Sequence, residues 1–381
     1  MKRSILYICF ATVALFSCKN ELDVLAPGEE TISVYGILNP NQAVQNIRIN
    51  KVFITEGDAV IAAQDQNTIN YGPGELKVTL QRFMNGSTTP TLTTVGNATK
   101  KEIVLTETVV TTANGTFNVG QRLWQTTDKL YNSGEYKLTI TNLSSGKEYT
   151  SQTTMVDSVK SYPAMPFIYV SAPAPNHYPV HCGTGNGAYT PPTASIQTFS
   201  VAYVNYSTVN SNQSIRFRSA ANAKLYKVVM RFHYIDTLAD GSYGGRKYVD
   251  MNFSDQISNT LTGGEEMMVK FNASEFYANI ASEIPKQATG AVKNRTAHYM
   301  EYIISACGES LQTFLQVNQP SNTIAQDKPN YSNIKGGVGV FGSISSTSIS
   351  KELWYDFIDR ISDDPSTSSL QFNKNRAFIC P

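Results

Sequence analysis

Hydrophobic and polar residues alternate with a period of two along much of the chain, which predicts half-buried β-strands. In the first half the alternation is clearest at residues 76–80 and 136–140, where every second residue is apolar. Residues 144–146 (SSG) separate the second of these runs from a returning strand at 148–155, which predicts a hairpin. About seven short strands with turn residues between them favour a β-sandwich of the immunoglobulin type.

The second half also contains many strand-like segments. Strands are predicted at residues 198–206, 215–218, 224–235, 246–253, 267–271, 297–306, 338–344 and 348–357. Asp240 and Gly241 stand between the third and fourth of these and predict a second tight hairpin.

Two segments of this half change to helical periodicity. The first begins at Asn272, which lies three residues before Glu275 as in a capping box, and Pro285 predicts its end. The second covers residues 309–319 and stops before Pro320. Its inward face is predicted to consist of Leu311, Phe314 and Leu315.

The N-terminus breaks the alternating pattern. Lys2 and Arg3 precede an apolar run of about 12 residues, which is too short to cross ~30 Å of hydrocarbon and matches the core of a secretory signal peptide. The run ends in residues 15–18 (LFSC), which resemble the lipobox of bacterial lipoproteins, although Phe16 is bulkier than that pattern prefers. The resemblance implies cleavage before Cys18 and acylation of its thiol. Two or three acyl chains would hold the protein on a membrane, because each buried CH₂ contributes ~0.8 kcal/mol.

The alternative is a plain secretory signal in which Cys18 is an ordinary residue. Lys19 follows the cysteine, in place of the aspartate associated with retention in the inner membrane. Residues 18–21 (CKNE) partly resemble the signals that send lipoproteins to the cell surface, with Asn20 where an acid is usual. We therefore expect a lipid-anchored protein of the outer membrane that faces the cell surface.

Proline and glycine divide the rest of the chain. Residues 157–195 are rich in both, and this proline density excludes central strands. The predicted division is a signal peptide at 1–17, a polar tether at 18–29, an immunoglobulin-like β-sandwich at 30–156, a connector at 157–195 and a second β-rich domain with two short helices at 196–381. The expected fold class is therefore mainly β.

Charge and composition narrow the class of function. Removal of Lys2 and Arg3 with the signal peptide leaves 29 basic against 30 acidic residues, so we expect no basic surface for nucleic acid. Charged residues make up only 16% of the chain, below the usual ~25%. Thr, Ser, Asn and Tyr take their place, which is typical of β-sheet proteins that work outside the cytoplasm.

Five cysteines are present, of which Cys9 leaves with the signal peptide and Cys18 is the lipidation site. Cys182, Cys307 and Cys380 remain in a compartment that permits disulfides. One disulfide and one thiol is the simplest arrangement, and three reduced core residues is the alternative. Spacing does not identify the pair, although a chain end such as Cys380 gains most from being tied down.

Metal and cofactor motifs are weak. His177, His181 and Cys182 are the best metal candidates, because imidazole and thiolate bind zinc. Pro179 lies between the two histidines and excludes the helix that would bring them together, although a loop could still do so. Incidental polar residues in a proline-rich loop are the preferred interpretation, and no metal site is predicted. Residues 337–342 form a G-x-G-x-x-G sequence without a following helix, and close backbone approach explains these glycines better than a cofactor does.

Other polar residues allow more than one interpretation. His233 and His298 lie in predicted strands, and we expect them to be core or surface residues. Four aspartates near the C-terminus accompany two aromatic residues: Asp356, Asp359, Asp363 and Asp364, with Trp354 and Tyr355. Such a group could contact a glycan, and a solvated terminal segment has the same composition.

Residues 331–341 (YSNIKGGVGVF) resemble the closing motif of a family of Bacteroidota lipoproteins built on a domain of unknown function, the 4249 type. Residues 34–40 (VYGILNP) and 47–53 (IRINKVF) resemble its opening strands, and 311–329 would be its helix and proline-broken loop. The resemblance covers most of the mature chain. It implies an outer-membrane lipoprotein of largely β architecture, and it brings no activity, cofactor or catalytic residue.

The preferred hypothesis is a non-catalytic, membrane-anchored lipoprotein that binds a glycan, a peptide or another outer-membrane protein. The first alternative is a surface hydrolase of glycans or peptides with dispersed carboxylates, since the two acids of a glycosidase stand ~5–10 Å apart and need not be close in sequence. The second is a structural protein of assembly or adhesion.

Overall fold

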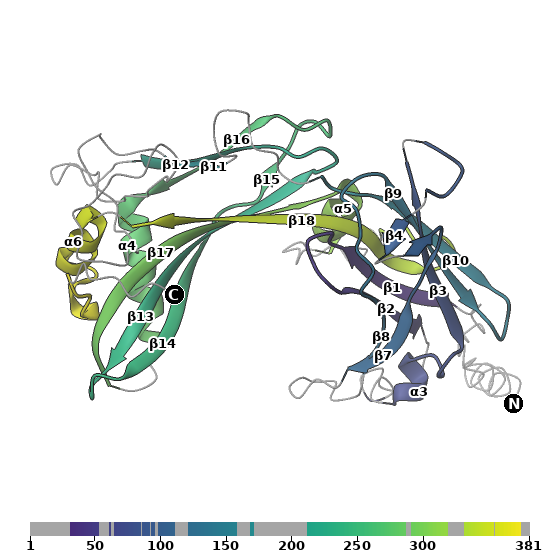
Figure 1. Ribbon diagram of the computed structural model, residues 1–381, viewed down its shortest axis with the longest axis horizontal. Coiled ribbons are helices and arrows are strands. Elements are labelled where there is room, and N and C mark those ends of the chain that lie inside the picture. The colour runs from purple at the N-terminus through teal and green to yellow at the C-terminus, as the bar shows by residue number, and fades with distance from the viewer. Residues whose placement is uncertain are drawn as a thin grey trace, which may run out of the picture.

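The fold is mainly β, as the alternating pattern predicts. The computed structural model describes residues 31–52, 61, 65–84, 86–91, 93–95, 98–110, 121–157, 168–170, 212–286, 291–318, 331–353 and 355–374. Figure 1 shows two lobes joined by one long strand, β18 (Val338–Glu352). The signal peptide, Cys18 and most of the proline-rich connector lie outside the described residues.

The first lobe is a sandwich of two sheets that bury their facing sides. One sheet has the order β18, β1 (Thr31–Leu38), β2 (Gln45–Val52), β8 (Gln121–Thr126) and β7 (Thr106–Val110). The other has the order β10 (Glu148–Thr154), β9 (Glu135–Asn142), β3 (Leu76–Phe83) and β6 (Ile103–Val104). A short helix, α3 (Gln66–Ile69), and the ribbon of β4 (Thr93–Val95) and β5 (Ala98–Lys100) flank them. Both sheets contribute to one core around Trp124, Tyr136 and Tyr149.

The second lobe packs helices against the other end of the same large sheet. Its strands follow the order β14 (Tyr243–Asn252), β13 (Leu225–Leu238), β17 (Val292–Cys307) and β18, with β15 (Gln256–Ile257) beside β13. One face is covered by α4 (Ala273–Lys286), α6 (Tyr355–Asp363), the short η1 (Ser368–Leu370) and a sheet of β11 (Ile168–Val170), β12 (Asn212–Arg218) and β16 (Glu266–Asn272). Figure 1 shows α4 and α6 on the side away from the first lobe.

Both predicted hairpins are confirmed. Strands β9 and β10 pair antiparallel, and Asn142 Oδ1 accepts the backbone N–H groups of Ser144 and Ser145 in the turn between them. Strands β13 and β14 pair antiparallel around Gly241, which has the positive φ of +87° that glycine tolerates best. Local turn chemistry was sufficient to predict both connections.

Strand β18 belongs to both lobes. Residues 338–343 pair in parallel with β1, and residues 344–352 pair antiparallel with β17. We predicted two separate strands, at 338–344 and 348–357, and this was wrong in two ways. The strand is continuous to Glu352, and residues 355–363 form helix α6. Phe357, Ile358 and Ile361 are buried at helical spacing, a short pattern that the preceding strand signal obscured.

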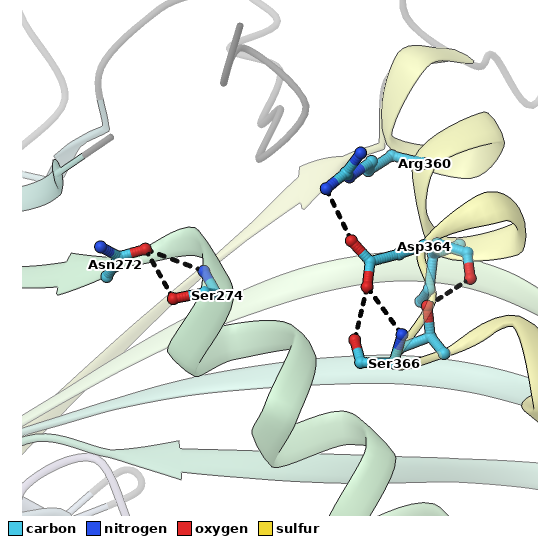
Figure 2. A network of polar contacts seen from close by, with 7 residues as sticks. Asn272, Ser274, Arg360, Asp364 and Ser366 are labelled. Carbon is cyan, nitrogen blue, oxygen red and sulfur yellow. Dashed lines mark hydrogen bonds and ion pairs between the residues drawn. The ribbon is translucent and has the colours of Figure 1, made fainter. Parts of the chain in front are cut away.

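The predicted helix starts are confirmed, with corrections to detail. The capping box of α4 forms: Asn272 Oδ1 accepts from Ser274 N–H at 2.9 Å (Figure 2), and Glu275 Oε2 accepts from Asn272 N–H at 3.1 Å. The helix runs one residue past Pro285. In α5 (Glu309–Val317), Leu315 is 43% exposed, so our prediction that it points inward was wrong. Within the described residues, no helix has both the length and the apolar character needed to span a membrane.

The segment before β18 closes the sandwich. Asn333 Nδ2 donates to Phe341 O at 2.7 Å, and Phe341 N–H donates back to Asn333 Oδ1 at 2.9 Å. Lys335 N–H donates to Thr150 O in the opposite sheet at 2.8 Å. The Phe341 ring is buried opposite Gly36, where a Cβ atom would lie 2.9 Å from it. This loop therefore ties the two sheets together.

The lobes meet around Ser343, which is fully buried in the middle of β18. Its hydroxyl donates to Thr154 O at 2.7 Å and accepts from Val156 N–H at 3.1 Å. Its carbonyl accepts from Gly308 N–H, at the start of α5, at 3.1 Å. One serine thus connects the end of the sandwich, the shared strand and the helix beside it.

Close approach of β1 and β18 requires Gly339. Its φ is +114°, and a Cβ atom there would lie 2.0 Å from Val34 O. We expect Gly339→Ala to lower the free energy of unfolding by about 3 kcal/mol or more, through backbone strain and overpacking together. Gly245→Ala is the control, because Gly245 has a φ of +98° with no atom within 4 Å of the added Cβ. It should cost only about 1–2 kcal/mol. Urea denaturation measures both, and equal losses would contradict the role of contact with Val34.

Candidate functional site

Polar and aromatic side chains gather on the face of β13, β14 and β17 opposite the helices. The alternate residues Tyr226, Val228, Met230 and Phe232 of β13 enter the core, so the residues between them face outward. We call the outward cluster the open-face patch; its seven residues are Arg231, His233, Arg246, Tyr248, Asp250, Tyr299 and Glu301. It lies on the sheet labelled β13, β14 and β17 in Figure 1.

Arg231 stands in the centre of the first row of the patch, between Asp250 on β14 and Glu301 on β17. Its Nε donates to Asp250 Oδ1 at 2.7 Å, and one terminal nitrogen donates to Oδ2 at 2.9 Å. This two-bond geometry fixes the guanidinium, and the hydrogen bonding to Asp250 raises the pKa of Arg231. The same guanidinium lies over the ring of Tyr248, 4.0 Å from its centroid.

His233 forms the centre of the second row, between Tyr248 and Tyr299. Its ring stacks on Tyr299 with the centroids 4.1 Å apart and an angle of 18° between the planes. The Tyr248 ring is 5.9 Å away on the other side. His233 Nε2 lies 3.0 Å from Glu301 Oε2, so the two rows are joined by a hydrogen bond.

Burial determines the protonation of His233, which is 8% exposed. Desolvation lowers its pKa, Glu301 opposes this by hydrogen bond and charge, and Arg231 and Arg246 lower the pKa further. The net effect is a pKa below the ordinary 6.5, so the imidazole is neutral at pH 7. A carboxylate only accepts hydrogen bonds, and the proton is therefore assigned to Nε2. Among the described residues, Nδ1 has no hydrogen-bond partner.

A β-bulge in β17 places Tyr299 and Glu301 on the open face. His233 pairs with Tyr299, but the next residue of β13 pairs with Ala297, so His298 is the extra residue. Ala297 on one side of the bulge and Met300 on the other are both buried in the core. An uninterrupted strand would place residues 297 and 299 on the same face. The bulge therefore makes the patch possible.

Strand β14 is fixed from the opposite face by buried charge. Asp236 is 1% exposed, and its carboxylate lies 2.9 Å from Lys247 Nζ and 3.1 Å from Arg295 Nε. Two cations on one carboxylate compensate its loss of hydration. Lys247 is on this inner side, so its neighbours Arg246 and Tyr248 project outward.

Two side chains of the patch are strongly exposed. Tyr248 is 47% exposed although Arg231 covers part of its ring. Arg246 is exposed, and its guanidinium lies 6.0 Å from the centroid of Tyr299. In the described part of the chain no ion pair involves Arg246, whereas Arg231 is neutralised by Asp250. The patch thus offers one uncommitted cation beside an aromatic surface.

Most of the candidates from sequence lie elsewhere. Cys18, His177, His181, Cys182 and Cys380 are outside the described residues. Across the described ranges, no group of three or more His, Cys, Asp or Glu residues could hold a metal ion.

Cys307 is a buried free thiol. Desolvation raises its pKa to about 11, so it stays protonated at pH 7. It behaves as a small core residue at the end of β17.

The glycine and aspartate motifs have structural roles. A Cβ atom on Gly337 would meet Ile32, and one on Gly339 would meet Val34. Strand β18 continues beyond both residues. These contacts confirm close backbone approach as the reason for glycine at the two positions. Asp364 is 2.7 Å from Arg360 and accepts from Ser366 N–H at 2.9 Å (Figure 2).

Asp364 therefore orders the turn after α6. Helix α6 contains Asp356, Asp359 and Asp363, so the acidic group lies on a helix and on the turn that follows it. Asp363 pairs on the surface with Lys374 at 2.6 Å.

Sequence reasoning placed His233 in a strand but missed the patch. The sequence does contain a local signal for an outward polar face. Arg231 and His233 alternate with apolar residues in one predicted strand, and Arg246 and Tyr248 occupy alternate positions in the next. The missing information was register, because Tyr299 is 66 residues away from His233 in the chain and enters the patch only through the bulge.

Comparison with known proteins adds no assignment. No protein-family model matches the sequence, and no curated protein matches it. Among solved structures, the secreted serine protease VesC from Vibrio cholerae matches with 7% identity and a TM-score of 0.15. The match covers 63% of this chain and 46% of that chain. A TM-score this low supports no conclusion about fold or activity.

The lowered pKa of His233 predicts a pH-dependent stability. Unfolded His233 binds a proton near pH 6.5, and the folded residue does so only at lower pH. Below about pH 6.5 the unfolded state therefore takes up more protons, and the free energy of unfolding should decrease until the folded pKa is passed. Urea denaturation of the wild type and of His233→Gln, from about pH 7.5 to about pH 5, measures this. The variant should lack this part of the decrease; identical curves would contradict the assigned protonation.

Proposed function

We propose that this protein is a non-catalytic, lipid-anchored binding protein of the outer membrane whose recognition surface is the open-face patch. One observation carries the proposal: the exposed ring of Tyr248, which Arg231 covers in part, and the exposed guanidinium of Arg246 share the sheet face opposite the helices. The ligand classes consistent with this surface are those expected from the sequence, namely a glycan, a peptide or a neighbouring protein.

The rigidity of the patch supports a binding role. Arg231 is fixed by two hydrogen bonds to Asp250, and it braces the exposed ring of Tyr248. His233 braces Tyr299 in the same way through its bond to Glu301. A surface whose side chains are already ordered loses less conformational entropy when a ligand binds. Exposed tyrosine and arginine are also the residues that contribute most at binding surfaces.

The contacts of His233 support binding over covalent catalysis. Its ring contacts two tyrosines, and its Nε2 is hydrogen-bonded to Glu301. In the described residues no serine, threonine or cysteine is hydrogen-bonded to this imidazole, whereas an activated nucleophile requires such a bond.

The alternative of a surface hydrolase makes a different prediction for Glu301. Asp250 and Glu301 lie on strands that flank β13, and two strand spacings separate them by roughly 9–10 Å at the backbone. A hydrolase that used these carboxylates would turn over a glycan or peptide and lose that activity in Glu301→Gln. Turnover abolished by this change would replace our proposal with the enzyme.

The lipid anchor rests on the lipobox-like residues 15–18 and is tested by fractionation. Cys18→Ala should move the protein from the membrane to the soluble fraction, because the acyl chains supply the membrane affinity. Cys380→Ala is the matched control, since it removes a cysteine that no lipobox precedes, and it should remain at the membrane. Membrane retention of Cys18→Ala would contradict the anchor.

Ligand binding by the patch is tested with two tyrosines of equal exposure. Tyr248 and Tyr35 are each 47% exposed, but Tyr35 lies on β1 in the first lobe. On glycan and peptide arrays, Tyr248→Ala should lose roughly tenfold or more of the wild-type affinity, because an aromatic contact is removed. Tyr35→Ala should bind as the wild type does. Equal behaviour of the two variants would exclude the open-face patch as the recognition surface.

A further inference from the structure

We propose that the open-face patch binds a chain of acidic sugars, with a sugar carboxylate at Arg246 and sugar rings against Tyr248. This inference rests on the proposed function and specifies its ligand. It starts from the charges that the patch leaves unpaired and from the shape of the surface around them.

Charge pairing leaves Arg246 as the cation available to a ligand. Asp250 is occupied by Arg231 through two hydrogen bonds, and Glu301 is occupied by His233. Arg246 is exposed on the same face, and in the described residues it has no carboxylate partner. Guanidinium groups bind carboxylates with paired hydrogen bonds, so an anionic group on the ligand is the complementary partner.

Aromatic surface beside this cation favours a ring with an apolar face. Tyr248 follows Arg246 by two residues on the same strand face, a separation of about 7 Å. One sugar ring bearing a carboxylate can reach both side chains. The Tyr248 ring is exposed, amphipathic and braced by Arg231, which suits contact with the apolar C–H face of a sugar.

The extended form of the surface favours a chain over a single sugar. Tyr243 is 66% exposed at the start of β14, and its pairing with Thr237 places it on the same face as Arg246. The order along the strand is therefore tyrosine, arginine, tyrosine. An open sheet face lets a polymer continue past both ends, whereas a single small ligand would be poorly enclosed there.

The charges of the patch favour an acidic sugar over a nucleic acid. Two carboxylates, Asp250 and Glu301, lie within the patch, and His233 is neutral at pH 7. Duplex DNA carries one phosphate charge for every ~1.7 Å of its axis, and its binding relies on several uncommitted cations. A single sugar carboxylate needs one cation, which Arg246 supplies.

The test is calorimetric titration of the soluble Cys18→Ala protein with uronic acid oligosaccharides. The probes are oligogalacturonate and oligomannuronate, and the methyl ester of each is the neutral comparison. The wild-type patch should bind an acidic probe, and esterification should weaken binding at least roughly tenfold, because a charge-assisted hydrogen bond is lost. Arg246→Gln should weaken the acidic probe by the same factor and leave the ester unchanged. Arg216→Gln is the control, because this arginine is exposed on β12 and pairs with Glu266.

The possible failures are distinguishable. If the neutral esters bind as tightly as the acids and Arg246→Gln has no effect, the claim that the ligand is acidic is overturned. A glycan site that depends on Tyr248 is then retained. Binding of acidic peptides, without any uronate, overturns the sugar and keeps the binding function of the patch. Loss of Tyr248 dependence for every ligand overturns the proposed function itself.

Discussion

The shared pairing of strand β18 is the constraint on which the rest of the structure depends. Its first residues complete the sandwich beside β1, and its later residues pair with β17 in the second lobe. Gly339 allows the close approach to β1, and Ser343 satisfies the backbone of both lobes at their junction. Two lobes that share a continuous strand cannot separate without breaking its hydrogen bonds.

The open-face patch depends on this arrangement through β17. Pairing with β18 fixes β17 on one side, and pairing with β13 fixes it on the other. The bulge at His298 then turns Tyr299 and Glu301 outward while Ala297 and Met300 fill the core. Strands β13 and β17 are interior to the large sheet, and the edge strand β14 is held by its pairing with β13 and by the contact of Lys247 with buried Asp236. The chemistry of the patch follows from side chains on that frame.

The segments that resemble the lipoprotein family lie together in the fold, away from the patch. Residues 34–38 are in β1, 47–52 are in β2 and 331–341 lead into β18, so all three form neighbouring strands. Their unusual residues have packing explanations: Gly36 admits the ring of Phe341, and Asn333 pairs with its backbone. These residues are therefore explained by packing, and they assign no ligand to the sandwich.

The sequence by itself determined the features that arise from neighbouring residues: strand alternation, the two hairpins, the capping box at Asn272 and the mainly β class. These depend on side-chain periodicity and on turn and cap bonds within a few residues. Tertiary structure decided the continuity of β18, the helix at 355–363 and the patch. Tyr35 and Val340 pair across about 300 residues, and a single bulge changes which face each side chain takes. No local pattern carries that register, because it is set by how distant strands pack against one core.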